Sequence, residues 1–491
     1  MKKSLLLKII CLALVLALAL CACGTPPENV TSGAQSGAQG GGEPVQTYPE
    51  ISGTVTFAVR DNVLEQTRAL LREFMTIYPN IRVEVQEFSS SDDLYTYLTT
   101  QSTAQNMPDV VLGWDNLSAF ALQNWLYPLN EFLEADDETQ YINQEILDGF
   151  TYEGQVYAVP SYLLFSSVVV NLDLLDELNL DVPGYDWTID EFVELAKAAT
   201  TTSTSGINHL ESLDQYLMMQ LQETGGQWGY DPATRTFNLT SGAFEQAERY
   251  VEDLRKVPQL VADDLRDPNV TANGGMDDYA KKFGANADGL ADGKILIANQ
   301  STWDDTWLAT SLEGINWDFY PIPGVTAESC KQIVHADYGM MLSTAQDPEA
   351  AFEVLKFFTY GKDGLLARMR LQEENAGGMF ANNRFTVPAS SHPEVAEMFA
   401  NCTNVPEGVK YMYAHMDNAV KGDYSKVLPD YWKVVNDSIY QAIERIRNGE
   451  DPASVAAETE AKINNDFAAS YAVFSEQMKQ VQSDFEAMRA Q

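Results

Sequence analysis

The regular alternation of strand and helix patterns after Ile51 limits the fold more than any other feature of this sequence. The predicted elements are a strand at Val55–Val59, a helix at Leu64–Tyr78, a strand at Ile81–Val85, a helix at Ser91–Gln105 and a strand at Asp109–Leu112. Strands that alternate with helices in this way form a sheet covered by helices. The predicted fold class is therefore α/β, with a doubly wound sheet.

Helix start signals predict further helices along the chain. A capping box that begins at Thr188 opens a helix through Ala199. Pro348 stands at the first position of a helix over Glu349–Phe358. The segment Ser454–Arg489 is charged, helix-forming and free of glycine and proline, which predicts a C-terminal helix.

The N-terminus has the pattern of an export signal. Lys2 and Lys3 precede the stretch Leu5–Leu20, which is apolar apart from Lys8. This stretch is short for a membrane-spanning helix and lies where signal peptides lie. Residues 1–22 are therefore predicted to be a signal peptide.

The end of this stretch resembles the lipobox of bacterial lipoproteins. Leu20 lies three positions before Cys23, and the small Ala22 lies directly before it. Cys21 fits the motif less well because it would follow the bulky Leu20. The resemblance implies that Cys23 carries acyl chains, palmitate among them, that anchor the protein on the outer, extracellular face of the cell membrane. The alternative is an ordinary cleaved signal with incidental cysteines.

A flexible tether is predicted after the lipid attachment site. Residues 23–47 are rich in Gly, Ser, Pro, Gln and Ala, and they include a run of three glycines. Such a composition has little to bury and behaves as a flexible coil. It would hold a folded body away from the membrane.

Composition sets limits on size and on partners. A length of 491 residues allows two or three domains, and 45% hydrophobic residues allow a sizeable core. The formal net charge is −40, from 31 Lys and Arg against 71 Asp and Glu. Such a surface repels phosphate backbones, which argues against a nucleic-acid partner. Solubility explains the acidity more simply than a role in binding cations does.

The sequence contains no recognisable catalytic or metal-binding motif. The four histidines are far apart, and neither an HExxH nor a GxSxG pattern occurs. Gly289–Ile295 resembles a phosphate loop, but a spacer is missing and Ile295 replaces the Ser or Thr. We therefore predict no catalytic residue, no metal and no cofactor. Cys330 and Cys402 could form a disulfide or remain two buried free thiols.

Several short motifs resemble, in order, those of the extracellular solute-binding proteins of carbohydrate ABC importers, the group that includes maltose-binding protein. The matching segments are Asn106–Val111, Leu126–Phe132, Tyr152–Pro160 with Asn171 and Leu174, Trp187–Phe192, Phe283 with Asp292–Ile295 and Trp303, and Tyr320–Pro323. Departures are Val170, where the family has tyrosine, and Leu296-Ile297, where Ala-Met is usual. Each motif is short, but the ordered set is specific to the family.

The resemblance implies a two-lobe, type II periplasmic-binding-protein-like fold. Each lobe would be a doubly wound sheet flanked by helices, joined to the other by a multi-segment hinge that closes on a ligand. The implied segments are residues 48–159 for the first part of lobe 1, 160–323 for the first part of lobe 2, 324–402 for the return to lobe 1 and 403–491 for the C-terminal helices of lobe 2.

The resemblance also implies a function in binding and not in catalysis. We expect a monomeric lipoprotein that captures an extracellular carbohydrate and delivers it to the permease subunits of an ABC transporter. One alternative is a binding protein for a polyamine, a peptide or a metal. Another is a surface lipoprotein enzyme that acts on glycans, which the absence of a catalytic motif disfavours.

Sugar chemistry selects the candidate ligand-binding residues. A pyranose has an apolar face that packs on aromatic rings and a rim of hydroxyls that bind carboxylates, amides and guanidinium groups. The candidates are Arg60 and Asp61 after the first strand, Trp114 and Asp115 after the third, Tyr162 after Pro160, Trp228 after Gly225-Gly226, Trp303 and Asp304 after the strand at Gly293–Asn299, and Tyr431 and Trp432 near the C-terminus. For each of them, simple structural packing is the alternative.

Overall fold

The computed structural model describes residues 46–490 except 61–62, 103–105, 114–115, 267–275, 376–377 and 382. Several predictions therefore concern residues outside the described part of the chain. They are the signal peptide, the lipid attachment at Cys23, nearly all of the tether, and the candidate ligand-binding residues Asp61, Trp114 and Asp115.

The first sheet confirms the predicted alternation of strands and helices. Strand β1 (Gly53–Arg60) pairs in parallel with β2 (Ile81–Phe88) on one side and with β3 (Val110–Gly113) on the other. Helices α2 (Leu64–Ile77) and α3 (Ser91–Ser102) connect these strands. The local strand and helix patterns are thus sufficient to define this half of the lobe.

Strand β11 (Gln332–Met341) completes the first sheet with partners from distant parts of the chain. It runs antiparallel to β3 and to β6 (Val159–Phe165), and parallel to β12 (Ala419–Lys421). The resulting order is β12-β11-β3-β1-β2, with β6 paired to β11. The helices around this sheet are α4 (Leu117–Leu122), α5 (Asn130–Ala135), α6 (Gln144–Asp148), α13 (Pro348–Phe358) and α14 (Lys362–Glu374).

A second, four-stranded sheet forms the core of the other lobe. Its order is β10 (Trp317–Pro321), β7 (Ser167–Asn171), β9 (Ile295–Ala298) and β8 (Ser205–Ile207). A single residue, Ser166, separates β6 from β7, so the chain passes directly from the first sheet to the second. A small hairpin of β4 (Thr151–Tyr152) and β5 (Gln155–Val156) precedes β6.

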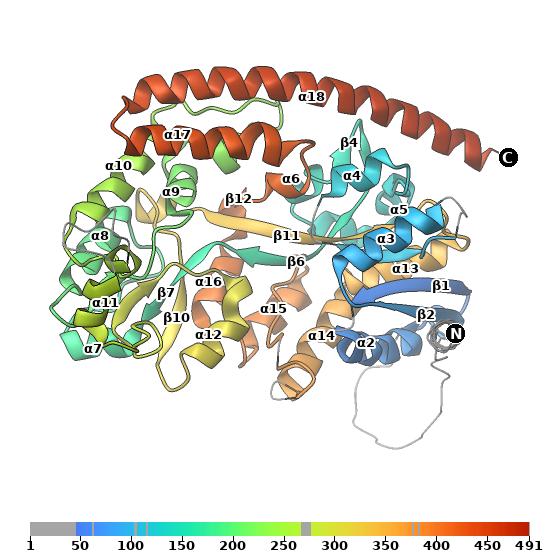
Figure 1. The fold of residues 1–491 in the computed structure, drawn as a ribbon. Helices are drawn as coiled ribbons and strands as arrows, with labels where there is room; N and C mark the ends of the chain where they lie inside the picture. The colour runs from blue at the N-terminus through green and yellow to red at the C-terminus, as the bar shows by residue number, and fades with distance from the viewer. Residues whose placement is uncertain are drawn as a thin grey trace, which may run out of the picture.

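Helices surround the second sheet, and the C-terminal helices lie along the molecule (Figure 1). Those in the second lobe are α7 (Leu172–Leu178), α8 (Ile189–Ala198), α9 (Leu213–Leu221), α10 (Ala243–Lys256), α11 (Met276–Phe283) and α12 (Asp305–Ser311). The remaining helices are α15 (Pro393–Asn401), α16 (Glu407–Ala414), α17 (Asp437–Arg447) and α18 (Pro452–Arg489). The capping box at Thr188, the N1 proline of α13 and the C-terminal helix are all confirmed.

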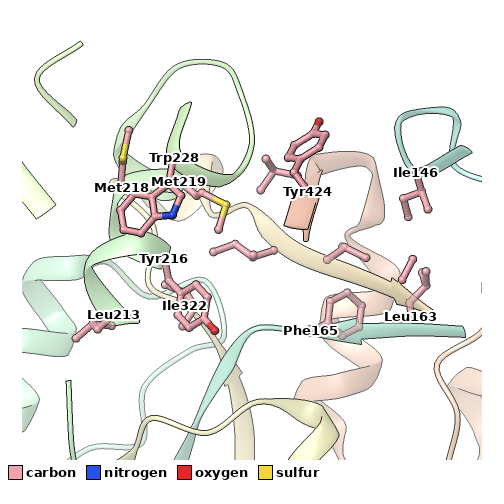
Figure 2. Packing of buried hydrophobic residues seen from close by; sticks show 14 of the residues in the cluster. Ile146, Leu163, Phe165, Leu213, Tyr216, Met218, Met219, Trp228, Ile322 and Tyr424 are labelled. Atoms are coloured by element: carbon pink, nitrogen blue, oxygen red, sulfur yellow. The ribbon is translucent and has the colours of Figure 1, made fainter. Parts of the chain in front are cut away.

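The apolar core continues across the junction between the lobes. Figure 2 shows Leu163 and Phe165 of β6 in the same cluster as Tyr216 and Met219 of α9 and Trp228. These side chains are at most 8% exposed. Strand β6 is therefore packed against side chains of both lobes.

The two cysteines in the described part of the chain are free thiols. Cys330 and Cys402 are both buried, which agrees with the second of the two possibilities left open by the sequence. Burial raises the pKa of each thiol to about 11, so neither reacts readily as a thiolate at neutral pH. No helix within the described residues has the length and apolar character needed to cross a membrane.

Candidate functional site

The paired strands β6 and β11 form a polar floor between the two sheets. Their antiparallel register sets Tyr162 opposite Asp337, and Leu164 opposite His335. Because side chains alternate along a strand, these four project from one face of the pair. Tyr162, Leu164 and His335 are partly exposed, whereas their neighbours along each strand are buried. This face of the first sheet therefore presents polar side chains of β6 and β11 beside the second sheet.

The first-lobe end of the floor opens into a small cavity of about 80 Å³. Its lining includes Arg60 at the end of β1, Tyr162, Asp337 and the partly buried Arg368. Burial and the Asp337 carboxylate raise the pKa of Tyr162 far above its ordinary value, so the phenol remains a neutral hydrogen-bond donor. Arg60 and Tyr162, which were predicted separately, thus line the same cavity.

A buried charge cluster lies beside the middle of the floor. Lys426 Nζ is 2.7 Å from Asp337 Oδ1 and 3.3 Å from Asp423 Oδ2, and Lys421 Nζ is 2.6 Å from Asp423 Oδ1. Asp423 also accepts a 2.8 Å hydrogen bond from the backbone N–H of Ala336 in β11. Burial alone would raise the pKa of Asp423, but the charges of Lys421 and Lys426 outweigh it and hold that pKa well below its usual range. The cluster fixes the segment after β12 to strand β11.

At the second-lobe end, Trp303 stands over the floor. Its ring lies 5.0 Å from the His335 ring at 73°, and its side chain is 46% exposed. The neighbouring Thr302 Oγ1 accepts a 2.8 Å hydrogen bond from Phe165 N, which ties this turn to β6. Burial lowers the pKa of His335 to about 4, so the imidazole is neutral at neutral pH and shares a 2.8 Å hydrogen bond with Ser166 Oγ. The turn is therefore fixed to β6, and the exposed indole of Trp303 lies beside the neutral imidazole of His335.

The second lobe contributes a larger cavity of about 430 Å³. Its lining includes His209 and Glu211 after β8, Trp228, and Tyr440 and Arg447 of α17. The cavity lies close to the Trp303 turn, because His209 Nε2 is 3.3 Å from Gln300 Nε2, which precedes that turn. Its lining thus combines acidic, basic and aromatic side chains.

The remaining predicted residues have more structural surroundings. Asp304 accepts a 3.1 Å hydrogen bond from Ser301 N and caps the short helix at Thr302–Asp304. Trp228 is 3% exposed, in the wall of the larger cavity, with a positive φ of 55°. Tyr431 is 2% exposed and packs in the core. Trp432 is 59% exposed and lines a separate groove of about 610 Å³ next to α18 and Asn116.

His335, Asp337, Asp423 and Lys426 were not among the ligand-binding residues predicted from the sequence. The alternation of β11 could have indicated that His335 and Asp337 share a face, had the strand been assigned. Asp423 and Lys426 carry no such signal, because charged residues of this spacing usually lie on a solvated surface. Only the long-range pairing of β12 with β11 brings them to the floor.

A bidentate ion pair between Arg384 and Asp305 joins the two lobes beside this site. Arg384 Nε donates a 2.9 Å hydrogen bond to Asp305 Oδ2 at the start of α12, and Arg384 Nη2 binds the other oxygen. The segment before Arg384 is held to the first lobe, because Gln66 of α2 binds the carbonyl of Met379 at 2.9 Å. The two halves of the site are thus connected by a charged contact as well as by the strands.

Comparison with known families decides the class of this two-lobed chain. The family model described as "Bacterial extracellular solute-binding protein" matches residues 61–359, well over half of the sequence. The chain belongs to this family. The resemblance inferred from the ordered motifs is confirmed, and the family and the fold are those of binding proteins.

Relatives of this solute-binding protein agree with its architecture. A lactose-binding protein from Rhizobium radiobacter is 24% identical over 205 residues, which cover 40% of this chain and 46% of that protein. A sugar transporter structure from Rhizobium etli, in an open conformation, has a TM-score of 0.62 at 18% identity and covers 84% of this chain and 99% of the other. The sugar-binding protein MalE from Xanthomonas citri has a TM-score of 0.59 at 16% identity, over 86% and 99% of the two chains. The expected type II two-lobe fold is therefore confirmed.

The described part of this solute-binding protein contains no group of three or more His, Cys, Asp or Glu side chains that could hold a metal ion. The acids Asp423 and Asp305 are instead paired with lysine and arginine side chains. Such pairs neutralise one another and leave hydrogen-bonding groups, not open coordination sites.

Proposed function

We propose that this protein captures an extracellular carbohydrate between its lobes and delivers it to the permease subunits of an ABC importer. The observation that carries the proposal is the exposed Trp303 ring held beside the polar floor of β6 and β11. The lactose-binding relative and the sugar-binding structural neighbours support the same ligand class. The predicted lobe segments and monomeric state belong to this proposal.

The geometry suits the two surfaces of a sugar ring. The free face of Trp303 can cover the C–H face of a pyranose, while Tyr162, Arg60 and Asp337 offer donors and acceptors to its hydroxyls. Because the aromatic group comes from one lobe and the polar groups from the other or from the hinge, a bound sugar contacts both lobes. It would therefore favour the arrangement in which they are close.

A thermal-shift screen of the purified full chain tests the ligand class. Mono- and oligosaccharides are compared with polyamines, short peptides and divalent metal ions, each at saturating concentration. We expect a sugar to raise the unfolding midpoint, because a ligand that binds only the native state stabilises it by mass action. A shift produced by a polyamine, a peptide or a metal, with none from any sugar, would overturn the proposal. Release of sugar products during incubation would instead indicate a glycan-cleaving enzyme.

Replacement of Trp303 by alanine tests the stacking residue. We expect the sugar that stabilises the protein most to bind Trp303→Ala about thirtyfold more weakly, a loss of about 2 kcal/mol typical of an aromatic anchor. Isothermal titration calorimetry measures the change. Trp307→Ala is the matched control, because Trp307 lies one turn later and is 48% exposed. Equal affinities for both variants and the wild type would remove Trp303 from the site.

We also propose that Cys23 anchors the protein through lipid. The support is the lipobox-like sequence before it and the extracellular assignment of the family. In cells fed a palmitate analogue, we expect the wild type to be labelled and to sediment with membranes. Cys23→Ala should lose the label and leave the membrane fraction, whereas Cys21→Ala should keep both. If the label persisted in Cys23→Ala and disappeared in Cys21→Ala, the lipid would be attached to Cys21 and the proposal would be wrong.

A further inference from the structure

Helix α18 is attached to the second lobe along its first half. Asn464 forms two hydrogen bonds with the backbone of Phe237, at 2.8 Å through its Oδ1 and at 2.9 Å through its Nδ2. Glu460 accepts a 2.7 Å hydrogen bond from Thr240 N. The ring of Phe467 lies 5.4 Å from that of Phe237, edge to face. Phe237 and Thr240 lie between α9 and α10, so these contacts belong to the second lobe.

The same helix is attached to the first lobe along its second half. The ring of Phe485 is 4% exposed and lies 5.0 Å from Tyr127, within the apolar cluster of the first sheet. Phe474 packs edge to face on Tyr152 at 5.0 Å, and Gln482 donates a 3.1 Å hydrogen bond to the carbonyl of Tyr152. Figure 1 shows α18 crossing from α17 and α10 to the region of α4 and β4. One helix therefore has buried side chains in contact with both lobes.

The helix between the two attachments is continuous. It spans 38 residues and contains neither glycine nor a proline after Pro452. At 1.5 Å per residue, such a helix is roughly 57 Å long. Rotation of the lobes about β6 and β11 must bend this rod or detach one of its ends, since sharp bends in helices need proline, glycine or an inserted group.

We infer that α18 is a strap that limits how far the two lobes can open. Its N-terminal half moves with the second lobe, and Phe474 and Phe485 hold its C-terminal half on the first. The inference concerns the mobility of the lobes in the absence of ligand. It therefore does not depend on the proposed sugar.

Paired glycine substitutions can distinguish two roles of α18: a restraint on lobe opening, and a helix that contributes only to overall stability. Ala468 and Ala472 are exposed and lie between the two sets of contacts, whereas Ala457 and Ala461 are equally exposed but lie within the second-lobe half. Ala468→Gly/Ala472→Gly, the crossing variant, makes the part of α18 between the two lobes easier to bend. Ala457→Gly/Ala461→Gly is the control, because it causes the same loss of helix propensity. Neither pair removes a buried contact, so both variants should fold.

Electron-spin distance measurements on the full chain without ligand provide the readout. Nitroxides are attached through a genetically encoded ketone amino acid at Glu349, exposed on α13, and at Val182, exposed after α7, so that the native cysteines are kept. We expect the distance distribution of the crossing variant to be roughly twofold broader than that of the wild type, and that of the control to be unchanged. Phe485→Ala, which weakens the first-lobe attachment, should broaden it as well.

The strap is overturned if the crossing variant and Phe485→Ala both give the distribution of the wild type. It is also overturned if the control pair broadens the distribution as much as the crossing pair does, because the effect would then be one of general helix stability. Failure of the sugar screen would leave these distances unaffected, so the two proposals fail separately.

Discussion

Replacing Asp423 with asparagine is expected to lower the free energy of unfolding by about 3–5 kcal/mol, the usual cost of removing one partner from a buried ion pair. Lys421 and Asp423 are only 1% and 2% exposed. The variant leaves the Lys421 ammonium buried without its counter-charge and removes one of the two carboxylates around Lys426. Denaturant unfolding at pH 7, followed by far-UV circular dichroism, measures the loss.

A surface pair provides the control for this change. Lys462 and Asp466 lie on α18, 2.8 Å apart, with side chains 57% and 51% exposed. Asp466→Asn is expected to cost less than about 0.5 kcal/mol, as exposed helix pairs do. Equal losses for Asp423→Asn and Asp466→Asn would contradict the structural role of the buried cluster.

The pH dependence of the Asp423 effect has a defined sign. The folded-state pKa of Asp423 is lowered, so its contribution to stability is present above the ordinary pKa of an aspartate and is lost as the pH falls toward the folded value. The stability gap between the wild type and Asp423→Asn should therefore stay constant at neutral pH and narrow only in acid.

Replacing Glu248 with glutamine is expected to stabilise the protein at pH 8 by about 2 kcal/mol or more. Asp214 on α9 and Glu248 on α10 are 6% and 1% exposed and interact directly. Burial first, and the Asp214 carboxylate second, raise the pKa of Glu248 to about 9, which the positive charge of Arg447 only partly offsets. With no proton on either group, both oxygens of Glu248 would be buried acceptors without a donor.

The stabilisation by Glu248→Gln should depend on pH in a specific way. The raised folded pKa means that the wild type loses stability as the pH rises from the ordinary value of a glutamate toward about 9. The variant should match the wild type near pH 4.5 and exceed it increasingly up to pH 9. Glu252→Gln, one turn later on α10 and partly exposed, is the control; it removes only a minor contribution to the raised pKa of Glu248 and should show a much weaker trend. If the wild type were more stable than Glu248→Gln at pH 8, the raised pKa of Glu248 beside Asp214 would be contradicted.

Local patterns were sufficient for the elements whose signals are short-range. The strands at Val55–Val59 and Ile81–Val85 and the capping box at Thr188 were identified correctly, because each depends on residues within one element. The ordered motifs then led to the two-lobe fold. The pairing of β11 with β3, β6 and β12 could not be derived in this way, since these strands come from four distant segments.

Site prediction was limited by burial, which the sequence does not show. Trp228 and Trp303 both follow loops in a second-lobe segment, yet one is 3% and the other 46% exposed. Tyr431 and its neighbour Trp432 differ in the same way: Tyr431 is 2% exposed and lies in the core, whereas Trp432 is 59% exposed. The polar partners of the floor depend on contacts between residues far apart in the chain, such as Asp423 with Ala336.

The position of Phe485 has a consequence for how the chain folds. The first lobe begins at Gly53, but its sheet needs β11, and its apolar cluster includes Phe485, more than 400 residues later. Contacts between residues so far apart in the sequence form slowly, because the entropy of closing a long loop is lost before apolar burial stabilises the contact. During synthesis, therefore, neither lobe can complete its core until almost the whole polypeptide has left the ribosome.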